Sequence, residues 1–366
     1  MVGIARRRKG KPLRSGYTTG ACAAAAAQAA TVALLRQEVV SQVQVNLTGA
    51  RVNFEVNRCV FDPIQASCSV IKDAGDDPDI TNGAEIWATV RWKGEVGIDI
   101  RGGKGVGVVT KPGLEVAVGM AAINPVPRQM IEHSVREVMS DKRDGKGIEV
   151  IISVVGGEAL ARKTLNPRLG IIKGISILGT TGVVTPYSVD AYQACISQAL
   201  DVAVACGCRQ VVLTTGRRSE KFAQGELALA EECFVQAGDF IGYSLKECAR
   251  RSFQKVTVWG MMGKLSKLAA GHMYTNVSDS RVDIGFLAGV AAGCGVPDKI
   301  VKALRTAVTA NHLRRMLPPE YARKFCNKLC LLAARKCCEE AGGKLGVECI
   351  MSSYDGIILG RGDAGT

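Results

Sequence analysis

The sequence is poor in aromatic residues and in histidine. Phe, Trp and Tyr make up 5% of its 366 residues, and only three histidines occur. None of the three, His133, His272 and His312, lies in a glycine-rich run, and the chain has neither a GxSxG elbow nor an HExxH motif. These absences argue against a serine hydrolase and a zinc peptidase. The few aromatics also argue against a surface that stacks nucleic-acid bases.

A CxxC pair is absent too, although the chain has 14 cysteines. Cys326, Cys330 and Cys337 recur at helical spacing in a stretch rich in Leu and Ala, so we predict buried, reduced thiols and no metal site. No apolar run reaches the roughly 18 residues that a membrane helix needs. The basic start leads through glycines into alanines, unlike a secretory signal. We therefore expect a cytoplasmic protein with no membrane partner.

The formal net charge of +13 is concentrated in two segments. Six basic residues and no acid lie in residues 1–14, and ten basic residues face two acids in residues 298–336. The rest of the chain is close to neutral and has no basic stripe with interleaved aromatics, so no nucleic-acid partner is predicted. We interpret residues 1–13 as a solvated, flexible basic tail, and we expect residues 1–11 to be dispensable for catalysis. An anionic small-molecule substrate is compatible with this charge.

The first half of the chain has the pattern of an α+β domain. Two alternating segments, 43–47 and 52–56, flank Thr48-Gly49-Ala50 and predict a hairpin. The pattern predicts helices at 21–36 and 127–139, and further strands at 68–72, 85–92, 96–101 and 148–155.

From about Ile175 the pattern changes to strand, glycine-bearing loop and helix. The predicted units are 175–178 with a helix at 189–205, 211–214 with a helix at 219–236, and 256–259 with a helix after Gly263. Such units build a parallel sheet that binds ligands at the carboxyl ends of its strands. Residues 298–340 are predicted as basic helices and 347–359 as a hairpin. We therefore predict an N-terminal α+β domain, 14–186, and a C-terminal α/β domain, 187–366, with the active cleft between them.

Several polar glycine runs have both a structural and a functional interpretation. Thr18 and Thr19 precede a predicted helix, so they either cap it or help its free N–H groups to bind a carboxylate. Residues 72–79 hold four aspartates, which suit a solvated turn, a calcium loop of irregular spacing, or a cation such as a sulfonium. Composition alone does not choose between these uses.

Two further kinds of run favour anion binding. Residues 101–107 form a glycine-rich loop with a lysine, although the order of a P-loop is absent. Two Asn-Pro turns, at Asn124 and Asn166, are each followed by an arginine suited to bidentate carboxylate binding. Structural turns alone would explain the prolines, but they explain less readily why both Asn-Pro turns have a nearby arginine.

Taken in order, these runs resemble the cobalt-precorrin-5B C1-methyltransferases (CbiD-type) of the anaerobic cobalamin pathway. Members of that family open with a GYTTGTCAAAAA-like segment, which residues 16–27 match with Ala21 in place of the usual Thr. The other matching segments are 72–85, 102–114, 122–131, 165–182 and 260–271. The resemblance covers residues 14–271 and is weaker beyond them.

The resemblance implies that the chain transfers a methyl group from S-adenosylmethionine to C1 of cobalt-precorrin-5B, giving cobalt-precorrin-6A in cobalamin (vitamin B12) biosynthesis. It implies a permuted ribosomal-protein-like fold for the α+β domain, followed by the α/β domain. An electron-rich ring carbon attacks an activated sulfonium methyl, so positioning supplies most of the catalysis. No covalent enzyme intermediate is expected.

Site residues follow from the matching runs. For the sulfonium cofactor we predict Asp76, Asp77, Asp79, Gly179, Thr180, Thr181 and Gly182. For the anionic corrin we predict Thr18, Thr19, Gly103, Lys104, Lys111, Asn124, Arg128, Asn166, Arg168 and Lys264. No catalytic residue is predicted, because Asn82, Met261 and Asn276 stand where relatives often carry histidine.

Two other functions stay open from the sequence. Glycine loops after strands also suit a dinucleotide-dependent oxidoreductase of tetrapyrrole metabolism, although a GxGxxG fingerprint with a following acid is absent. A non-catalytic tetrapyrrole-binding module is the second alternative. The sequence leaves open whether the chain forms a homo-oligomer.

Overall fold

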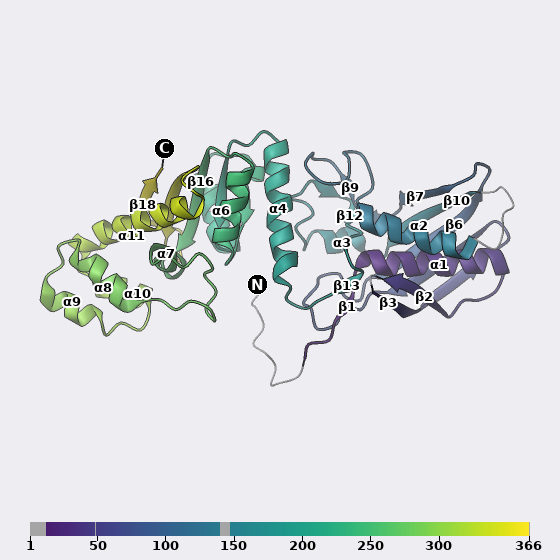
Figure 1. The fold of residues 1–366 in the computed structure, drawn as a ribbon, viewed down its shortest axis with the longest axis horizontal. Coiled ribbons are helices and arrows are strands. Elements are labelled where there is room, and N and C mark those ends of the chain that lie inside the picture. Colours follow the sequence, from purple (N-terminus) through teal and green to yellow (C-terminus); the bar gives the residue numbers. More distant parts are fainter. Residues whose placement is uncertain (1–11, 48, 140–146, 366) are drawn as a thin grey trace. The chain divides into compact units, whose positions relative to one another are not determined.

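The structure is a computed structural model that describes residues 12–47, 49–139 and 147–365. The predicted basic tail therefore lies almost entirely outside the described residues. The chain divides into two compact units, Met1–Val189 and Asp190–Thr366, called the first and the second unit below. Each unit has its own five-stranded sheet and its own core, and no sheet in the described part of the chain runs through both (Figure 1). The protein is thus a mixed α/β chain with several sheets.

The sheet of the first unit has the strand order β4-β5-β6-β10-β7. Its strands are β4 (Arg58–Phe61), β5 (Gln65–Ile71), β6 (Glu85–Lys93), β7 (Ile98–Gly102) and β10 (Gly147–Val154). Neighbouring strands are antiparallel except β7 and β10, which are parallel. The sequence predicted four of these strands. It missed β4, whose residues alternate only between partial and full exposure.

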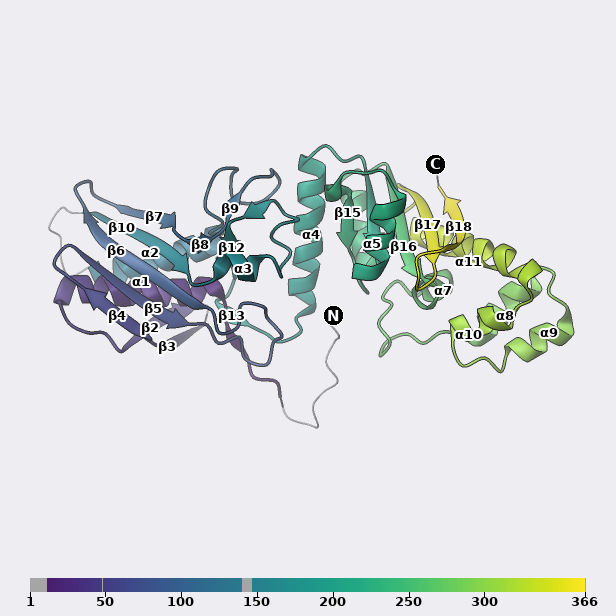
Figure 2. The same cartoon turned by 180° about the vertical axis from the view of Figure 1, so that it is seen from behind.

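Two helices cover one face of this sheet, and the view from behind shows the strands in front of them (Figure 2). These helices are α1 (Thr19–Arg36) and α2 (Pro125–Met139). Gly20 lies in the first turn of α1 and Pro127 in the first turn of α2, and a Cβ on Gly20 would lie 2.8 Å from Pro127, so both helices begin at the same end of the unit. The predicted hairpin forms as β2 (Gln42–Leu47) and β3 (Ala50–Glu55) and packs in the same core. Helix α1 is therefore buried on nearly all sides, which its run of small alanines permits.

Three short ladders extend the first unit beyond the sheet. They pair β1 (Gly16–Tyr17) with β13 (Val183–Val184), β8 (Gly105–Val106) with β12 (Gly174–Ile175), and β9 (Val108–Val109) with β11 (Ile171–Ile172). A short helix, α3 (Gly157–Ala161), lies beside β8 and β12. The prediction of 175–178 as the first strand of the parallel sheet is therefore wrong. Ile175 pairs inside the first unit, because the glycines at 105 and 174 let the two backbones meet.

The second unit has the predicted parallel sheet, in the order β15-β14-β16-β17-β18. Its strands are β14 (Gln210–Thr214), β15 (Phe234–Gln236), β16 (Lys255–Met261), β17 (Gly346–Ser352) and β18 (Ile358–Ala364). The first four are parallel, and β18 pairs antiparallel with β17, so the C-terminal hairpin is confirmed.

Helices lie on both faces of this second sheet. One core holds residues of α4 (Val189–Ala205), α6 (Ile241–Arg250), α7 (Met262–Ala269) and α11 (Pro319–Glu340), whereas α5 (Arg217–Glu226) packs in a smaller core on the other face. Helices α8 (Ile284–Ala292), α9 (Asp298–Leu304) and α10 (Ala310–Met316) complete the first of these cores. This two-sided arrangement is typical of α/β domains.

The predicted helix at 219–236 is too long. Helix α5 ends at Glu226, a 3₁₀ turn covers Glu231–Cys233, and β15 follows. Phe234 and Val235 are buried in the two different cores of the unit. A segment with apolar contacts on both faces is stable as a strand of a covered parallel sheet, which sequence periodicity does not distinguish from a buried helix.

The cysteine prediction is confirmed at the positions where it was most specific. Cys326, Cys330 and Cys337 are buried on α11, and all 14 cysteines are free. Burial raises the pKa of the Cys330 thiol to about 12, so this group stays protonated and unreactive at neutral pH.

Candidate functional site

The glycine and proline runs of the first unit gather at one end of its sheet. Strands β5, β7 and β10 all end there, and the loop after β7 is tied to β10. Gly103 N donates to Ile152 O at 2.7 Å, and Val154 N donates to Lys104 O at 2.9 Å. Both α1 and α2 start at this same end. We call this region the loop end of the first unit; it contains all predicted site residues except Lys264.

The start of α1 is held by the loop that precedes β13. Thr18 N donates to Gly182 O at 3.0 Å, Gly20 N donates to Leu178 O at 3.0 Å, and Thr18 Oγ1 accepts from Ala21 N. Thr19 Oγ1 is bonded to the backbone of Ser176 and Leu178. Both threonines are buried, and Thr18 is the N-cap. The capping interpretation therefore accounts for them, and the N–H groups named here are already used.

The acidic loop between β5 and β6 is tied to its own unit by every predicted carboxylate. Asp76 Oδ2 accepts from Arg14 N at 2.7 Å, and Asp77 Oδ1 accepts from Tyr187 N at 2.9 Å. Asp79 pairs with Lys72, whose Nζ lies 2.7 Å from Asp79 Oδ2 and whose side chain is 1% exposed. These contacts show how a loop so rich in like charges keeps one conformation.

Charge pairing shifts the titration of this loop. Burial acts to raise the pKa of Asp79, but the Lys72 charge and hydrogen bonds from Lys72 and Thr81 outweigh it, so the pKa of Asp79 is lowered. The Arg14 guanidinium lowers the pKa of Asp73 in the same way. Both carboxylates are therefore ionised at neutral pH.

The Gly-Thr-Thr-Gly loop is packed rather than open at its glycines. Gly179 has a φ of 129°, and a Cβ there would lie 2.4 Å from Thr18 Oγ1. A Cβ on Gly182 would lie 2.7 Å from Leu47. Thr180 and Thr181 are exposed, and Thr181 Oγ1 closes the turn through Val183. The glycines thus allow the loop to pack on α1 and the hairpin, while its threonines face solvent.

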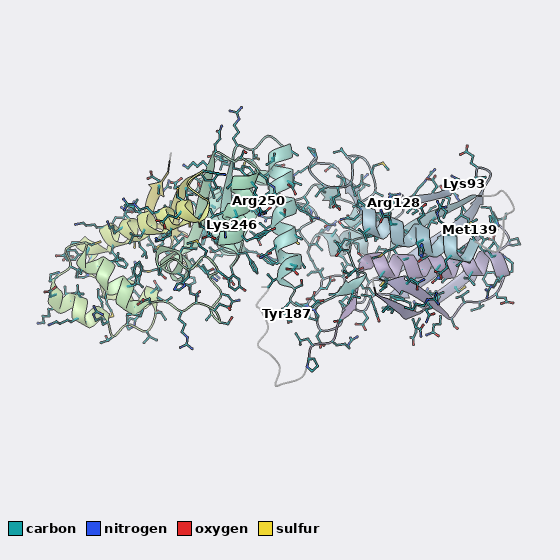
Figure 3. The ribbon with its side chains drawn as sticks, in the orientation of Figure 1. Lys93, Arg128, Met139, Tyr187, Lys246 and Arg250 are labelled. Carbon is teal, nitrogen blue, oxygen red and sulfur yellow. The ribbon has the colours of Figure 1, made fainter. Side chains whose placement is uncertain are left out.

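Cations for an anionic ligand also lie at the loop end. Lys104 is exposed, Lys111 Nζ donates to Arg168 O at 3.3 Å, and Arg128 Nη1 donates to Ile100 O at 3.0 Å (Figure 3). Asn166 is buried and bonded through both ends of its amide to Gly174 and Ser176, so it fixes the turn. The backbone carbonyl of Asn124 accepts from Arg128 N at the start of α2.

Large apolar side chains are exposed on the same loops. Val155 is 57% exposed, Leu178 49%, Ile172 44% and Leu165 38%. Exposed apolar groups beside cations are what a flat, largely apolar ligand with a carboxylate rim requires. The sequence analysis did not single these residues out.

Lys264 belongs to the second unit. Its Nζ pairs with Asp239 Oδ1 and donates to Thr275 O at 3.1 Å. Asp239 also accepts from Thr275 Oγ1 at 2.9 Å. The nearby Lys267 is buried and donates to Thr275 O at 2.9 Å, and burial followed by the Lys264 charge lowers the pKa of Lys267.

The second unit also has a pocket of about 400 Å³ that the sequence did not predict. Lys324 and Lys328 on α11, the turn after α8, and residues 361–363 of β18 line it. In the part of the chain that the structure describes, no three His, Cys, Asp or Glu side chains are placed to hold a metal ion. No described helix is both long enough and apolar enough to cross a membrane.

Comparison with known proteins identifies the family. The CbiD family model matches residues 6–186, and the model of the CbiD C-terminal domain matches residues 274–363. The chain belongs to the CbiD family.

Close relatives in this family span nearly its whole length. A cobalt-precorrin-5B C(1)-methyltransferase of Geobacillus kaustophilus is 49% identical over 353 residues, which cover 96% of this chain and 95% of the relative. The enzyme of the same name from Leptospira interrogans is 45% identical and covers 96% of both chains. A crystal structure of the cobalamin biosynthesis protein CbiD from Archaeoglobus fulgidus is 30% identical, covers 73% of this chain and 83% of that one, and has a TM-score of 0.40. The family models and the identity to the two enzymes confirm the resemblance noted in the sequence.

Proposed function

We propose that this chain methylates C1 of cobalt-precorrin-5B with S-adenosylmethionine, giving cobalt-precorrin-6A in anaerobic cobalamin biosynthesis. The observation that carries this proposal is the 49% identity, over 96% of the chain, to a relative named for that activity. Both units take part in the match. A methyltransferase needs a methyl donor, and a sulfonium donor supplies a methyl group that is already activated.

The reaction makes modest chemical demands on the protein. The ring carbon is the nucleophile and the thioether leaves as a neutral group, so the enzyme must mainly hold the two reactants in line and exclude water. The absence of histidine from the glycine runs is consistent with this demand.

The loop end of the first unit suits the corrin. Lys104 and Arg128 supply positive charge for its acetate and propionate carboxylates, and Ile172 and Leu178 supply exposed apolar surface for its ring. Thr18, Thr19 and Asn166 would act as structural support there, since their side chains already have partners. The permuted ribosomal-protein-like fold of this unit stays a prediction.

The acidic loop stays the sequence-based proposal for the cofactor. Asp76, Asp77 and Asp79 each have a partner in the chain, so each would have to exchange or share it to bind a sulfonium or an ammonium group. That exchange costs free energy.

The activity is tested by incubating the purified chain with cobalt-precorrin-5B and methyl-labelled S-adenosylmethionine without oxygen. We expect a labelled corrin that is one methyl group heavier. Binding of the corrin without transfer would instead support the non-catalytic module. Binding of a reduced nicotinamide dinucleotide, with no transfer, would support the oxidoreductase.

The substrate surface is tested with charge-removing variants. Lys104→Gln and Arg128→Gln should each raise the KM for the corrin, because each weakens corrin binding by about 0.5–2 kcal/mol. The KM for the donor should stay unchanged. Lys93→Gln is the matched control, because Lys93 pairs with Gly147 at the opposite end of the sheet (Figure 3). Equal effects of all three variants would contradict the assignment of the loop end to the corrin.

A further inference from the structure

The sheet of the second unit has a topological switch point between β14 and β16. The chain passes from β14 to β15 on one side, then crosses back to β16 on the other side and continues to β17. The helix after β14 packs on one face of the sheet and the helix after β16 on the other. The two connections therefore part at the carboxyl ends of these strands, which is where open α/β sheets bind ligands.

The loops at this switch point leave room for a ligand. A Cβ added to Gly216, after β14, or to Gly263, after β16, would meet no atom within 4 Å. The floor between them is closely packed: a Cβ on Gly260 would lie 3.0 Å from Thr215 Cγ2, and Thr215 N donates to Trp259 O at 3.2 Å. A closed floor with open glycines above it allows a ligand to approach the backbone.

An aromatic side chain lies on the β17 side of the switch point. Tyr354 follows β17 and is 62% exposed. The Arg218 guanidinium, which follows β14, lies 5.8 Å from the centre of the Tyr354 ring. Because β16 lies between β14 and β17, this pair reaches across the end of β16. An exposed ring and a guanidinium plane offer stacking surfaces for a purine base.

A pair of opposite charges lies on the β15 side. Asp239 follows β15, and Lys264 is in the first turn of α7, after β16. Their ion pair is held in place by Thr275, which donates to Asp239 through its hydroxyl and accepts from Lys264 through its carbonyl. An amino-acid group carries an ammonium and a carboxylate, so a carboxylate and an ammonium side by side are its chemical complement. Like the aspartates of the acidic loop, Asp239 and Lys264 would have to share or exchange their mutual contact to bind it.

We propose that the carboxyl ends of β14 and β16 bind a nucleoside that carries an amino-acid tail, with its base toward Tyr354 and its tail toward Asp239 and Lys264. The ends of β15, β14, β16 and β17 span about 14 Å at the usual strand spacing, enough for such a ligand lying across them. The inference rests on the proposed function, which requires a donor of this class. It moves the cofactor from the acidic loop of the first unit to the second unit.

The test measures binding of S-adenosylhomocysteine to the full chain by calorimetry. Gly263→Leu places a side chain in the open space over the switch point and should weaken binding at least tenfold, and Tyr354→Ala should weaken it about threefold to tenfold. Gly289→Leu is the matched control, because Gly289 is also an exposed helical glycine with no atom within 4 Å of its added Cβ. It should bind as the unchanged chain does.

Asp77→Asn, in the first unit, separates the two cofactor sites. If the inference holds, this variant binds S-adenosylhomocysteine as tightly as the unchanged chain. Loss of binding in Asp77→Asn with full binding in Gly263→Leu would overturn the inference and leave the proposed function intact. No binding of S-adenosylhomocysteine by the unchanged chain would overturn the donor itself. Melting curves like that of the unchanged chain establish that each variant is folded.

Discussion

Certain glycines at the loop end of the first unit and others at the switch point of the second unit serve opposite purposes. In the first unit, a Cβ on Gly16 would lie 2.1 Å from the backbone of Ala74, and one on Gly174 would lie 2.2 Å from the backbone of Gly105. In the second unit, the glycines at the strand ends, Gly216 and Gly263, have open space above them. A glycine-rich run in a sequence therefore does not by itself indicate a ligand site. Some glycines let two backbones touch, and others leave room for a ligand.

The charged pairs of the two units differ in their surroundings. The aspartates of the first unit stabilise its own loops, through Lys72, Arg14 N and Tyr187 N. Breaking a fixed pair of this kind is destabilising, and such a pair binds a second cation only by giving up a partner. The Asp239–Lys264 pair of the second unit is also fixed, through Thr275, but Lys264 directly follows Gly263, whose added Cβ would meet no atom within 4 Å. We therefore expect variants of the acidic loop in the first unit to act mainly on stability.

The largest effect is expected from breaking the buried pair of the first unit. Asp79→Asn leaves the Lys72 ammonium, with its 1% exposed side chain, without a charged partner. We expect it to lower the free energy of unfolding by about 3 kcal/mol. Urea titration, with hydrogen exchange read on peptides of each unit, measures the loss and shows whether it is confined to the first unit.

The pH dependence gives this prediction a second measurement. Because the pKa of Asp79 is lowered in the folded chain, its contribution is fully present above the unfolded value of about 4 and is lost as the pH falls through the folded value. The unchanged chain should therefore lose stability over this acid range more steeply than Asp79→Asn. Parallel curves would show that the pair contributes nothing to the stability of the first unit.

A smaller loss is expected from filling a backbone contact. Gly16→Ala forces the backbone of Ala74 away, which should cost roughly 1–3 kcal/mol. Gly94→Ala is the matched control in the same unit, since its φ is not in the left-handed region and no atom lies within 4 Å of its added Cβ. Unfolding in urea should distinguish the two. A stability loss as large in Gly94→Ala would mean that glycine flexibility, not close packing, matters in this unit.

Sequence reasoning predicted most of the second unit because its pattern is local. A strand of β-branched residues, a glycine and an amphipathic helix identify each unit of the sheet around β14 and β16. It failed at β15, where burial on two faces decides the conformation, and at Ile175, whose strand partner is 69 positions earlier at Val106. Non-local pairing of this kind leaves no periodic mark in the sequence.

The sequence predicted where the candidate site of the first unit lies, but it did not predict all of the contacts within it. The runs that resemble the family contain the loop end of the first unit, including Lys104 and Arg128. The sequence left open whether Thr18 is an N-cap or a ligand. It could not show that Asp76 and Asp77 accept from the backbone N–H groups of Arg14 and Tyr187, because these partners lie outside the acidic run. Arg218 and Tyr354 were missed for the same reason, since only the parallel sheet brings positions 136 residues apart to one edge.

The smallest effect, opposite in sign, is expected at the open glycine of the second unit. Gly263 lies in the first turn of α7, and alanine there restricts the unfolded chain without meeting any atom within 4 Å. Gly263→Ala should therefore raise the free energy of unfolding by about 0.4–1 kcal/mol. Thermal melting of Gly263→Ala beside Gly16→Ala gives the comparison in one experiment. The melting midpoint should rise in Gly263→Ala and fall in Gly16→Ala. A fall in both would show that the space over the switch point is not open, and the second unit would then offer a nucleoside no more room than the first.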